Sequence, residues 1–161
     1  MAAVTLEHLQ GNTWYIPAPT NIGVYVSEEG SGTEAGVKRR AILIDSGNDK
    51  EAGRQILKLF KEKGWELDFI VHTHSNADHI GGNAFIQKRT DCRIAATETE
   101  SAFINHPQLE PAFLFGGHPH PGILNKFLRA EPSKVTDIIE PEGRILGTPL
   151  SAVPLPGHFF N

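Results

Sequence analysis

Imidazole, carboxylate and amide side chains are concentrated in one short stretch of this sequence, VHTHSNADHIGG at residues 71–82. Neutral imidazole nitrogens and carboxylate oxygens are donors that zinc and related metals take from proteins. Donors two residues apart can face the same ion, and such a cluster rarely occurs by accident. The stretch therefore predicts a metal site that includes His74, Asp78 and His79.

The elements around this stretch place it where ligands usually collect. Residues 67–73 (LDFIVHT) are predicted to form a buried strand, and residues 82–90 a helix. Upstream, apolar residues recur at helical spacing between Asp49 and Gly64, with acidic residues at the start, so a helix is expected there. In α/β sheets, ligands bind outside the carboxyl ends of strands, which is where the cluster lies.

The rest of the chain is predicted to extend this unit into an α/β layered fold with parallel neighbouring strands. A helix is expected at residues 98–105, and strands at residues 13–16, 21–27, 41–45, 93–96, 135–139 and 151–155. The polar, Gly-rich segment 28–38 is predicted to be an exposed hairpin connection. The Pro-rich segment 106–132 is predicted to be an irregular wall or lid over a site, with a short helix at residues 123–128.

Length and composition indicate one soluble domain. The chain has 161 residues, 39% hydrophobic and 21% charged, with no apolar run near the roughly 18 residues of a membrane span. No secretory signal is visible, so a cytoplasmic location is predicted. The net charge of −4 and the scattered basic residues argue against a nucleic-acid partner. The single cysteine, Cys92, excludes an internal disulfide framework and is expected to be an inert, partly buried residue.

The histidine cluster resembles the signature of the metallo-β-lactamase superfamily, HxHxDH followed by a pair of glycines. Asp78-His79-Ile80-Gly81-Gly82 fixes the register, which makes His74 the first ligand and puts Asn76 where the family has its second histidine. An amide oxygen is a weaker donor than imidazole, so one tightly and one weakly held ion, or one ion alone, is expected. Ligation by Asn76 and a supporting hydrogen bond remain equally open. His72 falls outside the motif and is expected to be a buried strand histidine.

Two further segments strengthen the resemblance. Leu43-Ile44-Asp45-Ser46-Gly47 is similar to the strand and turn that precede the family's first helix, where the aspartate supports the site. Pro156-Gly157-His158 is similar to the turn that carries the family's next histidine ligand. The resemblance therefore implies a metal site built from His74, Asn76, Asp78, His79 and His158.

This resemblance also implies a fold and an activity. Residues 1–161 would form a single metallo-β-lactamase-like domain, truncated at the carboxyl end: roughly the first half of an αββα sandwich plus the start of the second. Its cofactor would be zinc, as one or two ions, with iron or manganese as alternatives. Water activated by the metal would attack an ester, thioester, lactone, lactam or phosphodiester bond of a small-molecule substrate, and Asp78 would both bind metal and orient that water.

Two other functions are kept beside the hydrolase. A catalytically incomplete metal-binding or interaction domain is favoured by Asn76 and by the absence of the family's second half from this sequence. An iron-dependent redox protein on the same scaffold is the third. Because half a sandwich would expose its apolar inner sheet face, a homodimer is predicted, formed by face-to-face packing or by strand exchange through residues 151–161.

Overall fold

Seven strands form one mixed sheet in the order β1-β2-β3-β4-β5-β6-β7. In this computed structural model, which describes residues 4–31 and 38–160, β1 to β4 are antiparallel neighbours and β4 to β7 are parallel neighbours. Their bounds are β1 Glu7–Gln10, β2 Thr13–Ile16, β3 Ile22–Ser31, β4 Lys38–Ile44, β5 Trp65–Val71, β6 Arg93–Ala96 and β7 Asp137–Ile138. A separate hairpin pairs β8 (Gly143–Arg144) with β9 (Ser151–Ala152).

In the part of the chain that the structure describes, five short or medium helices connect the strands: α1 Lys50–Lys63, α2 Ala77–Ile80, α3 Asn83–Gln87, α4 Glu98–Asn105 and α5 Leu109–Phe115, with a 3-10 turn at Pro121–Ile123. The longest, α1, has clear start and stop signals. The Asp49 side chain accepts hydrogen bonds from the backbone N–H groups of Glu51 and Ala52, and Gly64 adopts the left-handed conformation that ends the helix. Both signals lie at the positions predicted from the sequence.

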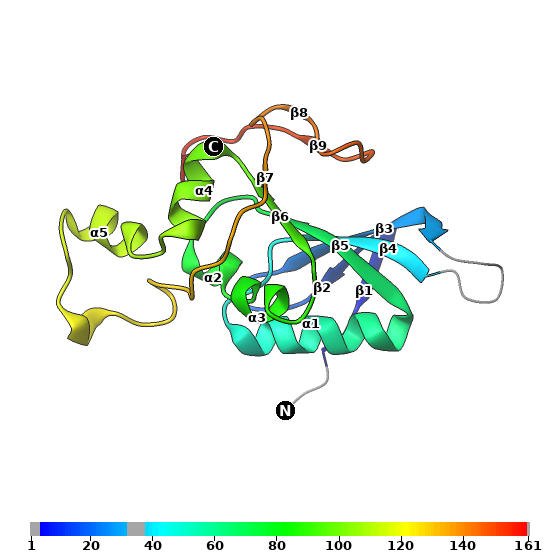
Figure 1. The fold of residues 1–161 in the computed structure, drawn as a ribbon, viewed down its shortest axis with the longest axis horizontal. Coiled ribbons are helices and arrows are strands. Elements are labelled where there is room, and N and C mark those ends of the chain that lie inside the picture. The colour runs from blue at the N-terminus through cyan, green and yellow to red at the C-terminus, as the bar shows by residue number, and fades with distance from the viewer. Residues whose placement is uncertain (1–3, 32–37, 161) are drawn as a thin grey trace.

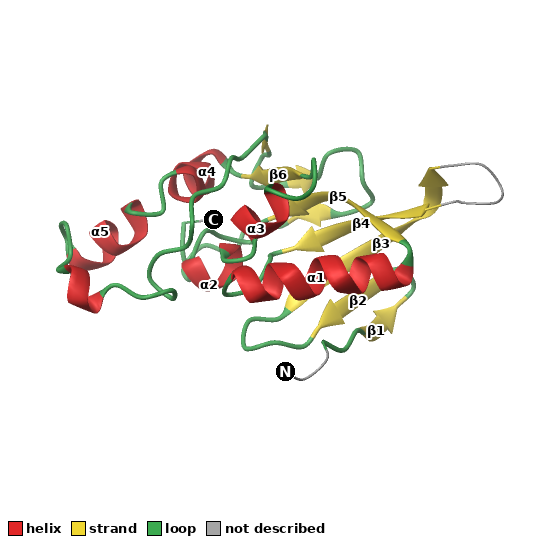
Figure 2. Cartoon of the chain, turned by 60° about the horizontal axis from the view of Figure 1, so that its bottom comes forward, coloured by secondary structure: helices red, strands yellow, loops and turns green. Residues whose placement is uncertain are grey.

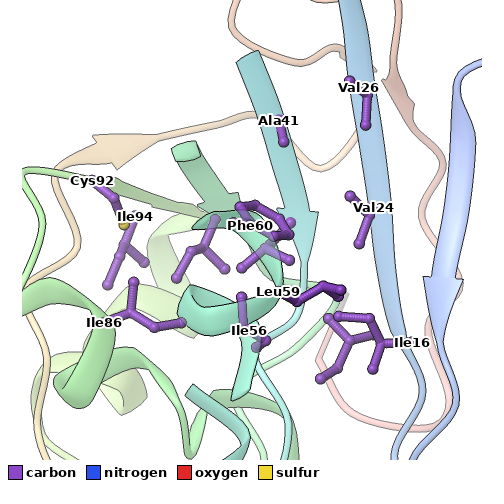
Figure 3. Packing of buried hydrophobic residues seen from close by; sticks show 13 residues of the cluster. Ile16, Val24, Val26, Ala41, Ile56, Leu59, Phe60, Ile86, Cys92 and Ile94 are labelled. Atoms are coloured by element: carbon purple, nitrogen blue, oxygen red, sulfur yellow. The ribbon is translucent and has the colours of Figure 1, made fainter. Parts of the chain in front are cut away.

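The sheet is buried on both faces because its central strands β4 and β5 end in continuous apolar runs, 41–44 and 69–71, whose successive side chains point to opposite faces. Leu43 and Ile70 belong to the cluster that includes Ile56 and Phe60 of α1. Figure 2 shows α1 lying along the sheet, and Figure 3 shows Ile56 and Phe60 among the side chains of this cluster. The neighbours of Leu43 and Ile70 on the strands belong instead to a second cluster, which includes Ile145 of the β8–β9 hairpin. Figure 1 shows α1 (cyan) on one side of the sheet and this hairpin (orange) on the other. The predicted α/β layered class is therefore confirmed.

Most predicted elements exist, but several boundaries differ. The predicted helix at residues 82–90 is shorter, because the helical stretch is interrupted at Gly81-Gly82, and α2 precedes it. The two last predicted strands each shrink to two residues, and β1 and β8 were not predicted. Strand β3 extends to Ser31, so the predicted hairpin loop at 28–38 is too long at its start; residues 32–37 lie outside the described part.

The segment 106–132 departs most from prediction. The short helix expected at 123–128 is absent from this described segment, which instead contains α5. Pro111 is compatible with this helix because it is the third residue of α5, where no intrahelical hydrogen-bond donor is needed. Gly116, in the left-handed conformation, ends α5. The helix lies away from the sheet in both views (Figures 1 and 2).

Within residues 4–31 and 38–160, no helix combines the length and the apolar character that a membrane crossing requires. The fold of one chain does not test several of the predictions. These are the cytoplasmic location, the single domain over residues 1–161, the homodimer, and the exclusion of nucleic-acid and membrane partners. They stay predictions.

Candidate functional site

The candidate site lies at the carboxyl ends of the parallel strands. Asp45 directly follows β4, and His72, Thr73 and His74 directly follow β5. Backbone hydrogen bonds hold these ends together: Asp45 N–H donates to the Val71 carbonyl at 2.9 Å and His72 N–H to the Ala95 carbonyl at 3.1 Å. We call residues 74–79, which run from the end of β5 into α2, the ligand loop.

Asp45 is the buried centre of this site. Its Oδ1 accepts from Thr73 N–H at 3.0 Å and from His72 Nδ1 at 3.2 Å, and its Oδ2 accepts from the Thr73 hydroxyl and His79 Nδ1, both at 2.7 Å. Burial alone would raise the pKa of Asp45, but these hydrogen bonds and the charge of the two imidazoles hold the pKa well below its usual range. Asp45 therefore supports the site as a carboxylate, as the resemblance implied.

The hydrogen bonds fix the protonation of His74. The Thr73 hydroxyl donates its only proton to Asp45, so at the 2.9 Å contact between Thr73 Oγ1 and His74 Nδ1 the imidazole must donate. Its Nε2 then carries a lone pair, and this buried atom has no hydrogen-bond partner in the described parts of the chain. Burial and the nearby charge of His79 lower the pKa of His74 to about 4. Near neutral pH, His74 is thus an uncharged imidazole with a free donor nitrogen.

His79 and Asp78 lie beside His74. The His74 and His79 rings have centroids 3.9 Å apart. Because Asp45 can only accept, His79 donates through Nδ1, and its Nε2 lies 3.8 Å from Asp78 Oδ2. Burial would lower the pKa of His79, but the hydrogen bond to Asp45 raises it above its usual value. The hydroxyl of Thr20, from the β2–β3 connection, donates to Asp78 Oδ2 at 2.8 Å and fixes that carboxylate.

Two buried glutamates hold the backbone of the ligand loop. Glu100 of α4 accepts from Ser75 N–H at 2.8 Å, and Glu110 of α5 accepts from Ala77 N–H at 2.9 Å. Between these anchors, the buried Asn76 Oδ1 has no hydrogen-bond partner among residues 4–31 and 38–160. Burial raises the pKa of both carboxyls, that of Glu110 to about 7, where the charges of Asp78 and Glu100 also raise it.

The structure also places four further histidines. The His158 ring centroid lies 4.8 Å from that of His74, so the distant Pro-Gly-His segment reaches the ligand loop. His72 is buried, and its two ring nitrogens lie 3.2 Å from Asp45 and 3.0 Å from Asn83, which leaves none for a metal. His118 and His120 are exposed and do not belong to the site.

The fit of this site to a metal is partial. In the described ranges, no group of three or more His, Cys, Asp and Glu side chains is positioned to hold an ion as it stands. The donor chemistry nevertheless fits, because buried polar atoms normally have partners and here His74 Nε2 and Asn76 Oδ1 have none within the described chain. A cation within reach of either atom would satisfy it. Metal binding by the five predicted residues therefore remains a proposal.

Comparison with known proteins decides the family. A family model described as the metallo-beta-lactamase superfamily matches residues 35–159, which is most of the chain. The chain belongs to the metallo-β-lactamase superfamily.

Relatives and solved structures agree with this membership. A hydroxyacylglutathione hydrolase of Rhodopseudomonas palustris (strain BisB18) is 33% identical over 84 residues, 52% of this chain and 29% of that protein. Crystal structures of metallo-β-lactamases from Bradyrhizobium japonicum (subclass B3) and Novosphingobium pentaromativorans are 19% and 22% identical, with TM-scores of 0.64 and 0.62. Each aligns with 91% of this chain, over 49% and 48% of its own length. The chain thus spans about a third of the length of its first curated relatives and about half that of these structures.

Steric crowding explains why both positions of the signature's glycine pair are occupied by glycine in this chain. A Cβ on Gly81 would lie 2.3 Å from the Asn48 carbonyl carbon and 2.5 Å from the Asp49 nitrogen, and one on Gly82 would lie 2.4 Å from the Ser46 carbonyl oxygen. The β4–α1 connection therefore packs directly on the backbone that follows the ligand loop and α2.

Gly81→Ala is expected to destabilise the protein by about 2–3 kcal/mol, because backbone atoms cannot move aside as a flexible side chain can. Its φ of −61° suits alanine, so the loss would come from the clash alone. Gly117→Ala is the matched control, since a Cβ there meets nothing within 4 Å in the described structure. Urea unfolding of both variants measures the difference, and equal midpoints would contradict the packing argument.

Sequence reasoning missed Thr20, Asn83, Glu100 and Glu110 as parts of the site. Glu100 resembles any acidic residue in the first turn of a helix, and Glu110 lies in a Pro-rich segment predicted to be irregular. Thr20 lies 58 residues from Asp78 in the chain. No local pattern marks such contacts, because each depends on how distant elements pack.

Proposed function

We propose that this chain carries the metal site of a metal-dependent hydrolase, with zinc held by His74, Asp78, His79 and His158 and by the weaker donor Asn76. The observation that supports it best is a pair of buried metal-donor atoms in the ligand loop, His74 Nε2 and Asn76 Oδ1, which have no hydrogen-bond partner within the described residues. Since the chain spans only part of its relatives, the activity of the whole protein belongs to this proposal.

The chain's own residues have distinct roles in this proposal. When bound, zinc supplies a Lewis acid that polarises a carbonyl or phosphoryl group and makes water acidic enough to ionise near neutral pH. Asp45 holds His79 with Nδ1 protonated, which leaves Nε2 as the donor. Asp78, fixed by Thr20, orients the attacking water.

Among the ester, thioester, lactone, lactam and phosphodiester bonds considered, a thioester receives support from the hydroxyacylglutathione hydrolase relatives. Its hydrolysis forms a C–O bond to the acyl carbon and breaks the C–S bond. The two protons of water end on the acid and on the leaving thiol. The substrate would then be a small molecule.

The second candidate is a catalytically incomplete metal-binding or interaction domain. The specific observation that favours it is Asn76 in place of a histidine, together with the lack of a preformed group of three ligands among the described residues. Metal binding and activity must therefore be measured separately.

Zinc titration of the purified chain tests the metal site. The wild-type chain should bind about one zinc tightly, His74→Ala should lose it, and Asn76→His should gain affinity on the order of tenfold or more because imidazole is the stronger donor. His118→Ala is the matched control, since this histidine is exposed and outside the site. Equal zinc affinity in wild type and His74→Ala would refute the proposed ligand set.

Hydrolysis of a hydroxyacylglutathione thioester by the zinc-loaded chain then separates the two candidates. Turnover that disappears in Asp78→Ala supports the hydrolase. Zinc binding without turnover of any of the five bond types supports the incomplete domain. Metal analysis of the purified protein distinguishes zinc from iron or manganese.

A further inference from the structure

Thr73 connects the buried Asp45 to the first predicted metal ligand, His74. Its backbone N–H donates to Asp45 Oδ1 at 3.0 Å and its hydroxyl donates to Asp45 Oδ2 at 2.7 Å, so this threonine contacts both carboxylate oxygens. The same hydroxyl oxygen lies 2.9 Å from His74 Nδ1. The side chain of Thr73 therefore lies between the charged centre of the site and an imidazole of the ligand loop.

Charge fixes the direction of these hydrogen bonds. A carboxylate only accepts, and a hydrogen bond to a charged acceptor is roughly twice as strong as one between neutral groups. The single hydroxyl proton of Thr73 therefore points to Asp45, and the hydroxyl oxygen is left to accept from His74 Nδ1. Because the hydrogen bond of one ring nitrogen decides which nitrogen of a neutral histidine carries the proton, His74 Nε2 keeps its lone pair.

The same carboxylate oxygen acts on a second imidazole. Asp45 Oδ2 also accepts from His79 Nδ1 at 2.7 Å, and the rings of His74 and His79 have centroids 3.9 Å apart. One oxygen atom thus leaves Nε2 as the donor nitrogen in two neighbouring ligands. It acts directly on His79 and through the hydroxyl of Thr73 on His74.

We propose that Thr73 is a positioning residue that selects the metal-binding nitrogen of His74. It does so by holding the Nδ1 proton with a hydroxyl that Asp45 orients, and it is not itself a ligand. The consequence for zinc rests on the metal site proposed above, whereas the position of the His74 proton is a property of the metal-free chain.

Thr73→Val is the decisive variant, because valine has the shape of threonine and puts a methyl group in place of the hydroxyl. Thr73 is exposed and lines, with His74, a cavity beside the ligand loop, so water can replace a hydroxyl that is merely removed. A methyl group at the same place excludes that water. The preference for a proton on His74 Nδ1 is then lost, and a substantial fraction of the ring should carry it on Nε2.

Nitrogen-15 NMR of the metal-free chain near neutral pH locates this proton. In wild type, His74 Nδ1 should have the chemical shift of a protonated ring nitrogen and Nε2 that of an unprotonated one, and the His74→Ala spectrum assigns both signals. In Thr73→Val the two shifts should move towards each other or exchange. Thr73→Ser returns the hydroxyl and should restore the wild-type shifts.

Zinc affinity is the second measurement. Thr73→Val should weaken zinc binding about 10- to 100-fold, which is the usual loss when a group that orients a metal ligand is removed. Thr73→Ser should restore the affinity, and Thr73→Ala, which admits water, should lose less than Thr73→Val. Thr90→Val is the matched control, because it removes a hydroxyl that donates to the Ile86 carbonyl at 3.0 Å, outside the site. It should change neither measurement.

The order of the variants separates this role from a packing role. If Thr73 only fills space, alanine should be the most damaging replacement and valine the least, and that order would overturn the proposal. Unchanged His74 shifts in Thr73→Val would overturn it as well. Changed shifts in this variant, together with a wild-type chain that binds no zinc, would support control of the His74 proton by Thr73 and reject the metal site proposed above.

Discussion

Asp45→Asn is expected to destabilise the protein by about 3–5 kcal/mol and to weaken zinc binding about 10- to 100-fold. The carboxylate accepts four hydrogen bonds, and its partners include His72 and His79. An amide would replace one accepting oxygen by a donating NH₂ group and would remove the negative charge that faces the two imidazoles, which is costly in a buried network. His79 would also lose the partner that orients its Nε2.

The choice of asparagine isolates the charge from the backbone. Asp45 has a φ of 66°, in the left-handed region, which asparagine tolerates and alanine does not. Asp78→Asn is the control, because the Asp78 carboxylate is only half-buried and accepts from Thr20 alone in the described structure. It should affect zinc binding with little change in the urea midpoint. Similar midpoints for both variants would show that Asp45 does not organise the site.

Acid titration of unfolding provides an independent measure of Asp45. Its folded pKa is depressed, so its contribution to stability is present above the unfolded value of about 3.8 and lost as pH falls towards the folded value. The free energy of unfolding of wild type should therefore fall below about pH 4 more steeply than that of Asp45→Asn.

The sequence predicted those features that depend on local order. Residues near one another in the chain set three of these features: the apolar runs of β4 and β5, the capping residues Asp49 and Gly64, and the position of the histidine cluster after a buried strand. Backbone geometry fixes the direction of successive side chains, so such local patterns predict helices and strands directly. This is why the α/β class and the location of the site could be predicted.

What could not be predicted depends on long-range packing. The resemblance suggested Asp45 as support, but its simultaneous contact with His72 and His79 requires the ends of β4 and β5 to meet. The helix α5, and with it Glu110, was missed because the Pro-rich segment 106–132 was predicted to be irregular. The segment 106–132 was expected to form the wall of the pocket, yet none of its residues lines the cavity beside His74; it reaches the site through the backbone of the ligand loop.

Glu110→Gln is expected to change how stability depends on pH. Burial raises the pKa of Glu110 from 4.5 to about 7, so the folded state binds this proton more tightly than the unfolded state does. Wild-type stability therefore loses a contribution as pH rises from about 4.5 to about 7, and the loss is complete above that range. Glutamine keeps an oxygen that can accept from Ala77 N–H and has no proton to lose.

The difference between variant and wild type isolates Glu110 from the histidines that titrate nearby. His79, with a raised pKa, also favours the folded state at lower pH, whereas His74, with its pKa lowered to about 4, opposes it, and both are present in both proteins. We expect nearly equal unfolding free energies near pH 4.5 and a glutamine variant that is more stable by on the order of 1 kcal/mol at pH 8, after allowance for solvent screening. Urea unfolding at these two pH values measures this difference.

Glu98→Gln on α4 is the control, because it removes the same charge from an exposed position. This variant should not become more stable than wild type as pH rises from 4.5 to 8. If Glu110→Gln instead loses stability equally at both pH values, the carboxylate charge is required for holding Ala77, and the loop is anchored by an ionised Glu110 throughout.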